Sequence, residues 1–224
     1  MQSKSFTAAS SGSFSSNVTA GNSVVLVQFA YTNATSTTIS TSSPTFNGGS
    51  VSGASKLMEQ QSAMTVASVY GAAWLLPNLA GGAASVGLTV TNGTVDSNVG
   101  MVGYEISGLG ASPQLDSGAS PNPAETAGNS TNPASGSTGA LTQSQEILFG
   151  MAVEYGVAVT GPSSPWANLA PSSLCAAGYQ VVSTAGGFAY NTTSGSVQRW
   201  IAGICAVRAT PATPGSTLLK ATFP

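Results

Sequence analysis

Short runs of apolar and β-branched residues, separated by turn residues, dominate the hydrophobic pattern of the chain. Residues 23–31 (SVVLVQFAY) lie between two polar turn signals, and residues 84–91 (ASVGLTVT) alternate strictly between apolar and polar positions. Runs of this length and composition are typical of β-strands. The predicted strands are 23–31, 64–76, 84–91, 99–106, 146–153, 174–182, 187–191 and 197–208.

Evidence for helices is thin. No apolar period of 3.6 residues is sustained over three turns, and Gly, Ser and Thr interrupt most windows. One short helical turn is predicted at 56–61 (KLMEQQ). Many short strands at regular spacing, with turns between them, predict an all-β fold of the β-sandwich, jelly-roll-like kind.

Residues 110–140 differ from the rest of the chain, because they hold four prolines and almost no large apolar side chain. This composition predicts a long loop between two halves of similar plan, 21–109 and 141–210. The halves are either two small domains or parts of a single sandwich spanning 21–210. We favour the single sandwich, because a half of about 70 residues buries too little core to be stable alone.

The two ends of the chain look like extended arms. Residues 1–20 are polar and residues 211–224 are Pro-containing, and neither offers much core of its own. We expect at least one arm to lie against a neighbouring subunit through backbone hydrogen bonds and small side chains.

Charge is scarce: five basic and seven acidic residues stand in 224, and histidine is absent. An average soluble domain has about a quarter of its residues charged. The surface is instead expected to consist of Ser, Thr, Asn, Gly and Ala, which suits packing against other proteins. Five scattered cations cannot form a nucleic-acid-binding stripe or a basic membrane-surface helix. No run reaches the roughly 18 apolar residues of a membrane span, and no secretory signal peptide is expected.

The absence of histidine excludes the Ser-His-Asp triad, the Cys-His dyad and histidine-based zinc sites. We therefore expect no catalytic residues, no metal and no cofactor. Glu105 and Glu154 stand inside apolar strands, at matching places in the two halves, and outward-facing or edge positions are expected for both. Calcium at 96–98 or at Asp116 lacks the ligand density of a dedicated site, so turn-forming roles are favoured there.

The cysteines and the tryptophans lead to further expectations. Cys175 and Cys205 are either two buried thiols or a disulfide. Trp74 and Trp200 lie in apolar strands and are expected in the core, whereas Trp166 lies in a loop. Trp166 is therefore the candidate for contact with a partner or a glycan.

Several short segments resemble a group of β-sandwich domains found in tailed-phage virion proteins and bacterial surface proteins. They are 21–27 (GNSVVLV) with Phe29, 44–48 (PTFNG), 73–81 (AWLLPNLAG), 85–90 (SVGLTV), 104–109 (YEISGL) and 199–204 (RWIAGI). The resemblance covers about residues 20–210. It implies a sandwich fold and a role in virion assembly or surface attachment, and it supplies no catalytic residues.

The resulting hypothesis is a non-enzymatic virion structural protein of a bacteriophage, either a capsid decoration (cement) protein or a tail-associated subunit. Its expected partners are other virion proteins and copies of itself, and its expected place is the virion surface after synthesis in the host cytoplasm. The competing hypothesis is an extracellular carbohydrate-binding or adhesion module that uses Trp166. A glycosidase built on two of the seven carboxylates ranks last.

Overall fold

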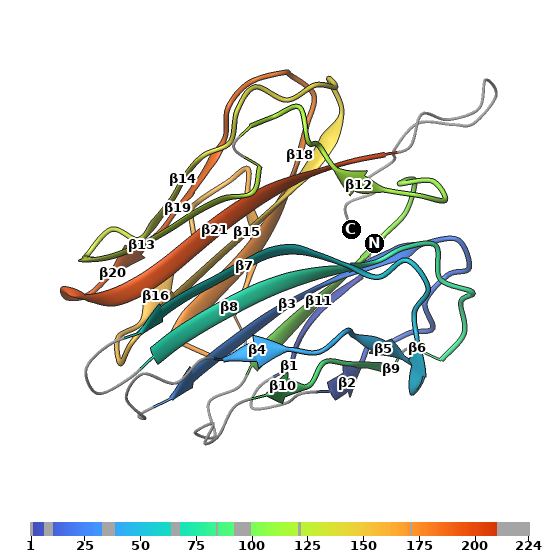
Figure 1. The fold of residues 1–224 in the computed structure, drawn as a ribbon, viewed down its shortest axis with the longest axis horizontal. Helices are drawn as coiled ribbons and strands as arrows, with labels where there is room; N and C mark the ends of the chain where they lie inside the picture. The colour runs from blue at the N-terminus through green and yellow to red at the C-terminus, as the bar shows by residue number, and fades with distance from the viewer. Residues whose placement is uncertain are drawn as a thin grey trace.

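The computed structural model describes residues 2–6, 11–32, 39–63, 68–83, 85–91, 100–120, 122–170 and 172–209 of the chain. Within these ranges the regular structure is entirely β, which confirms the predicted all-β sandwich class. Two antiparallel sheets face each other (Figure 1). None of the described segments forms a helix long and apolar enough to cross a membrane.

The first sheet, sheet I, is built from the N-terminal half. Its strand order is β1-β11-β3-β8-β7. The bounds are β1 (Ser3–Phe6), β11 (Gly100–Ile106), β3 (Ser23–Thr32), β8 (Ser68–Leu76) and β7 (Ser55–Ala63). Its outer face is partly covered by a small sheet of order β2-β9-β5-β6 and by the pair β10-β4. These strands are β2 (Ser11–Ser13), β9 (Ser85–Gly87), β5 (Thr45–Phe46), β6 (Gly49–Ser50), β10 (Val90–Thr91) and β4 (Ser40–Thr41).

The second sheet, sheet II, has the order β12-β21-β15-β18-β17, and β13 also pairs with β21. The bounds are β12 (Gln114–Leu115), β21 (Gln198–Arg208), β15 (Glu146–Glu154), β18 (Cys175–Val182), β17 (Ala167–Leu169) and β13 (Ala124–Ser130). Two short pairs complete the outer side of this half. They are β14 (Ala134–Ser137) with β19 (Ala189–Asn191), and β16 (Val159–Thr160) with β20 (Thr193–Ser194).

The two halves repeat one topology. In sheet I the opening strand β3 lies between the closing strand β11 and β8, and β7 lies beyond β8. In sheet II the opening strand β15 likewise lies between the closing strand β21 and β18, and β17 lies beyond β18. A further strand, β1 or β12, pairs with the outer side of each closing strand. The similar plan seen in the sequence thus corresponds to the same strand order in space.

Three layers of buried side chains hold the structure together. The central layer lies between the sheets and draws on both halves, with Val27 and Val102 from sheet I and Phe149 and Ile201 from sheet II. The other two layers cover the outer faces of sheet I and sheet II. Every residue of β8 and of β15 is buried. Because both faces of these strands are covered, their sequences are continuously apolar instead of alternating.

Two sequence predictions differ from the structure. The helical turn predicted at 56–61 is wrong, because these residues belong to β7. A bulge between Lys56 and Met58 lets the consecutive Leu57 and Met58 both become buried, each 2% exposed. The predicted long loop at 110–140 contains β12, β13 and β14, and β13 pairs with β21 along all seven of its residues.

The structure describes parts of the predicted N-terminal arm and none of the predicted C-terminal arm. Residues 3–6 and 11–13 of the N-terminal segment pair with β11 and β9 of the same chain. Residues 211–224 lie outside the described residues.

Candidate functional site

Four of the six carboxylates in the described part of the chain are buried. Glu105 is 4% exposed, and Asp116, Glu146 and Glu154 are fully buried. The expectation that Glu105 and Glu154 face outward is therefore wrong. Nor do they occupy matching places, because Glu105 lies in the closing strand β11 of its half and Glu154 ends the opening strand β15 of the other. Their surroundings decide what each carboxylate can do.

Glu105 accepts hydrogen bonds from three directions. Its Oε1 accepts from the Thr19 backbone N–H at 2.8 Å and from Asn22 Nδ2 at 2.6 Å. Its Oε2 accepts from Gln2 Nε2 at 2.6 Å. The carboxylate therefore joins the N-terminal segment and the turn before β3 to the closing strand of sheet I, which is a structural role.

Asp116 and Glu146 lie together beneath the segment that follows β12. Burial disfavours ionised Asp116, but hydrogen bonds from Thr142 Oγ1 at 2.5 Å, Thr142 N at 2.6 Å and Gly118 N outweigh it and lower the Asp116 pKa. Burial and the neighbouring Asp116 carboxyl raise the pKa of Glu146 to about 7, although Gln143 N–H and Arg208 act in the opposite direction. Asp116 is thus held ionised, whereas Glu146 titrates near neutral pH and is protonated in mildly acidic solution.

The fourth buried carboxylate, Glu154, accepts a hydrogen bond from Ser194 Oγ at 3.0 Å. Burial raises its pKa, and the Ser194 hydrogen bond only partly opposes this. Its other oxygen, Oε2, has no hydrogen-bond partner. Protonation of Glu154 lowers the cost of leaving that oxygen without a partner in the interior.

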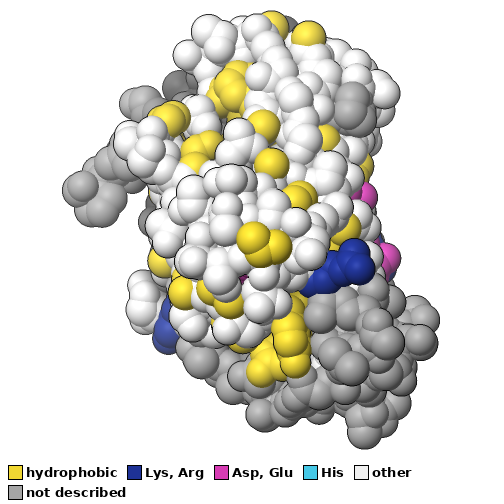
Figure 2. Space-filling view, turned by 90° about the vertical axis from the view of Figure 1, so that its left-hand side faces the viewer, with side chains coloured by type: hydrophobic (Ala, Val, Ile, Leu, Met, Phe, Trp, Pro, Cys, Tyr) yellow, Lys and Arg dark blue, Asp and Glu magenta, His cyan; other side chains and the backbone are white. Residues whose placement is uncertain are grey.

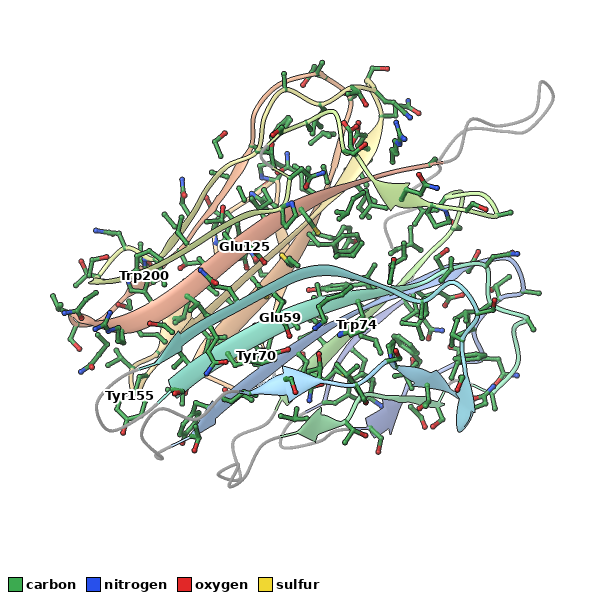
Figure 3. All side chains as sticks on the ribbon, viewed as in Figure 1. Glu59, Tyr70, Trp74, Glu125, Tyr155 and Trp200 are labelled. Atoms are coloured by element: carbon green, nitrogen blue, oxygen red, sulfur yellow. The ribbon has the colours of Figure 1, made fainter. Side chains whose placement is uncertain are left out.

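The remaining cluster of ionisable groups lies along the edge where β7 meets β13 (Figure 3). Glu59 forms an ion pair with Lys56 at 2.7 Å and accepts a hydrogen bond from the Tyr70 hydroxyl at 2.5 Å. The Glu59 backbone N–H donates to Glu125 Oε1 at 2.5 Å, so Glu125 ties the edge of sheet I to sheet II. Burial raises the pKa of Glu125, and the charge of Glu59 adds to the shift.

A chain of polar groups extends this cluster beneath β4. Trp74 Nε1 donates to Thr41 Oγ1 at 2.9 Å, and Thr41 Oγ1 lies 3.0 Å from the Tyr70 hydroxyl. Burial and the hydrogen bond to Glu59 raise the Tyr70 pKa, so this hydroxyl stays protonated and acts as a donor. The Lys56 ammonium lies 5.2 Å from the centre of the Trp74 ring, a cation–π contact.

The carboxylates of this edge cluster make contacts that stabilise the fold, and their arrangement does not fit that of a glycosidase. A glycosidase needs one free carboxylate and one protonated carboxyl on either side of a substrate. Here Glu59 is neutralised by Lys56, and Glu125 is occupied by the main chain of β7. Nor do the described residues contain a group of three or more His, Cys, Asp or Glu side chains suited to a metal ion.

Cys175 and Cys205 are free thiols, both buried in the central layer, so the disulfide considered from the sequence is not formed. Strand β15 separates them, since Cys175 pairs with Val153 and Cys205 pairs with Phe149. Two strand spacings of ~4.8 Å and an offset of four residues at ~3.3 Å each keep the two Cα atoms far apart. A disulfide needs Cα atoms within roughly 7 Å. Burial raises the pKa of Cys175 to about 11, so its thiol is unreactive.

Two of the three tryptophans lie in the core, as the sequence predicts. Trp74 and Trp200 are each only 8% exposed, which confirms their core positions. Trp166 is half-buried and packs edge-on against Tyr190, with ring centres 4.8 Å apart. Tyr190 is held in turn by a hydrogen bond from its hydroxyl to Asn168 Oδ1 at 2.7 Å. Trp166 is thus packed against the body of the protein instead of standing free.

The outer side of the second half is almost free of charge. We call it the outer layer and define it by the edge strands β13 and β17 of sheet II together with the pairs β14–β19 and β16–β20. The sequence has no lysine or arginine between Lys56 and Arg199, and the only acid of the outer layer is the half-buried Glu125. The upper part of Figure 2 shows mainly uncharged side chains on one face of this half. Among the described residues the only large exposed hydrophobic side chains are Val181 and Val197. The outer layer is therefore polar, neither charged nor markedly apolar.

Sequence reasoning missed the Asp116–Glu146 pair and the Glu59–Glu125 contact. Their members lie 30 and 66 positions apart in the chain. The pairing of β12 with β21 brings the first pair together, and the pairing of β13 with β21 beside β7 brings the second together. No local motif marks either contact. Comparison with known proteins adds no assignment, since no protein-family model, no curated protein and no solved structure matches the chain.

Proposed function

We propose that this protein is a non-enzymatic structural subunit of a bacteriophage virion, a capsid decoration (cement) or tail-associated protein that works by packing against other virion proteins. The observation that carries the proposal is the uncharged outer layer. The resemblance of the sequence segments to virion β-sandwich domains supplies the phage context.

An uncharged polar surface suits a permanent protein interface. Removing an ion from water costs far more than removing a hydroxyl or amide that finds a new partner, and the centres of interfaces are depleted of charged residues. In this chain the acids that would otherwise lie on the surface of the second half are turned inward, as with Asp116, Glu146 and Glu154. The outer layer can therefore be covered by a partner without burying unpaired charges.

The arrangement of the carboxylates supports the non-enzymatic part of the proposal. Each of the clusters around Glu105, Asp116 and Glu59 connects segments that lie far apart in the sequence. In each cluster at least one oxygen of every carboxylate is engaged by a donor of the protein itself, which restricts its access to a substrate.

The test is co-fractionation with virus particles. Antibodies raised against the purified protein are used to follow it through density-gradient separation of particles from lysed cultures of the source. We expect the protein to band with intact particles at a constant ratio to the major capsid or tail protein. Its recovery only in the soluble fractions, while particles band without it, would contradict the proposal.

A glycan array separates this function from the carbohydrate-binding alternative. We expect no specific glycan binding by the wild-type protein. Strong binding to a defined glycan that is lost in Trp166→Ala and retained in a control, Val197→Ala, would favour the adhesion module instead.

A further inference from the structure

A cleft opens at one end of the sandwich, where the two halves meet. Its volume is about 790 Å³, within the range of clefts that hold ligands. Pro77, Pro113 and Leu115 provide apolar walls, and Ser52 and Ser117 provide hydroxyl groups. The single ionic group of its lining, Lys56, is already paired with Glu59, so the cleft suits an uncharged occupant.

The described chain ends beside this cleft. Arg208 and Val207, the last residues of β21, pair with Gln114 and Leu115, and both of these partners line the cleft. Figure 1 shows β21 running past β12 toward the end of the molecule. The described part of the chain therefore ends, at residue 209, next to strand residues that pair with the lining of the cleft.

The sequence of residues 210–224 is largely uncharged, like the lining of the cleft. It carries three large apolar residues, Leu218, Leu219 and Phe223, and one charge, Lys220. Pro211 and Pro214 each restrict the residue before them to extended conformations. The prolines thus favour an extended course at the start of this segment, and an extended segment reaches a neighbouring molecule more readily than it folds back into the cleft beside which it begins. A neighbouring molecule lies within reach, since 15 extended residues span up to ~50 Å.

We propose that the cleft lined by Pro77, Pro113 and Leu115 receives residues 210–224 of a second copy of this chain. This inference rests on the proposed function, because it names the contact by which copies of an assembling subunit join. Donor segment and acceptor cleft are different surfaces, so successive contacts either close into a ring, of which a reciprocal dimer is the smallest, or extend as a filament. The occupant binds mainly through Leu218 and Leu219 against the proline and leucine walls, with its backbone hydrogen-bonded to the hydroxyl rim.

The experiment uses variants of the full chain that each lose one side of the contact. The acceptor-only variant lacks residues 211–224, and the donor-only variant fills the cleft with Ser52→Trp and Ser117→Trp, both at exposed positions. Ser196→Trp is the matched control, because Ser196 is equally exposed and precedes the opposite end of β21. Leu218→Ser with Leu219→Ser tests the proposed anchors within the intact chain. Self-association is measured by sedimentation velocity over a concentration series, and thermal unfolding verifies that each variant is folded.

We expect the wild-type protein and Ser196→Trp to associate, and each single-sided variant to self-associate at least about tenfold more weakly. A mixture of the acceptor-only and donor-only variants should form a one-to-one complex, because only one complete contact is available. Monomeric wild-type protein throughout the series, normal association of the deletion variant, or no complex in the mixture would each overturn the inference. None of these results would change the co-fractionation of the protein with particles, so the proposed function is tested separately.

Discussion

The side-chain amide of Gln2 donates a hydrogen bond to the carboxylate of Glu105 at 2.6 Å, across 103 positions of sequence. The same carboxylate accepts from Thr19 and Asn22, so one buried acid connects the residues at the start of β1 with the turn before β3. Part of the N-terminal segment, which the sequence predicts as an extended arm, is thereby attached to sheet I of the same chain. This contact leads to the first prediction.

Glu105→Ala should lower the free energy of unfolding by about 2–4 kcal/mol, because several donors lose a charged acceptor in a mostly buried site. Glu105→Gln retains one acceptor oxygen and should cost clearly less. Urea denaturation measures both, and amide hydrogen exchange of residues 3–6 should accelerate in Glu105→Ala. A loss below about 0.5 kcal/mol would show that the carboxylate does not hold this segment.

The Asp116–Glu146 pair predicts a defined pH dependence. The Glu146 pKa is about 7 in the folded protein, against 4.5 for an ordinary glutamate. The folded state therefore holds a proton that the unfolded state releases, and this contribution to stability is complete below pH 4.5 and is lost as the pH rises toward 7. The lowered pKa of Asp116 acts the other way, and its contribution is lost in acid.

Glu146→Gln should flatten the fall in stability between about pH 5 and pH 7 by on the order of 2 kcal/mol. Glu125 and Glu154 also have raised pKa values, so the measured quantity is the difference between the wild-type and variant curves. Urea denaturation at a series of pH values provides it. Curves that run parallel through this window would contradict a protonated Glu146.

The cysteines should behave as two buried thiols. We expect a thiol reagent such as DTNB to modify neither cysteine in the native protein and both in denaturant, without prior reduction. A reducing agent should leave the melting temperature unchanged, because no cross-link is present to be broken. Absence of free thiols in the denatured, unreduced protein would contradict the strand register that separates Cys175 from Cys205.

Gly150 should be intolerant of a side chain. A Cβ at this position would lie 2.2 Å from the ring of Tyr190, which supports Trp166. Gly150→Ala should destabilise the protein by about 1–3 kcal/mol and alter tryptophan fluorescence. Gly195→Ala is the matched control, because its nearest neighbour, Val157, lies at an ordinary 3.7 Å. Equal stability of the two variants would contradict the close packing of β15 against Tyr190.

The sequence predicts the long central strands well and the outer strands poorly, for a physical reason. Strands such as β3, β15 and β21 are covered on both faces, so apolar runs mark them. In contrast, β13 has the polar sequence AETAGNS and is a strand only because β21, about 70 residues later, offers it a partner.

The candidate sites follow the same rule. The outward-facing expectation for Glu105 and Glu154 assumed that one face of each strand meets water, and the structure covers both faces. The scarcity of charge on the outer layer, by contrast, can be predicted from composition alone, without knowing which strands pair. What composition cannot show is which acids are turned inward, because that depends on the register of the sheets.

The most direct test of the central claim, assembly through an uncharged surface, is the salt dependence of binding to purified particles. The bound fraction is measured from about 0.1 M to about 1 M NaCl, where the screening length falls from roughly 10 Å to roughly 3 Å. We predict an apparent affinity that changes by less than about twofold, because few charges are present to be screened. A fall of about tenfold or more over this range would show that ionic contacts drive the association, and would contradict the account.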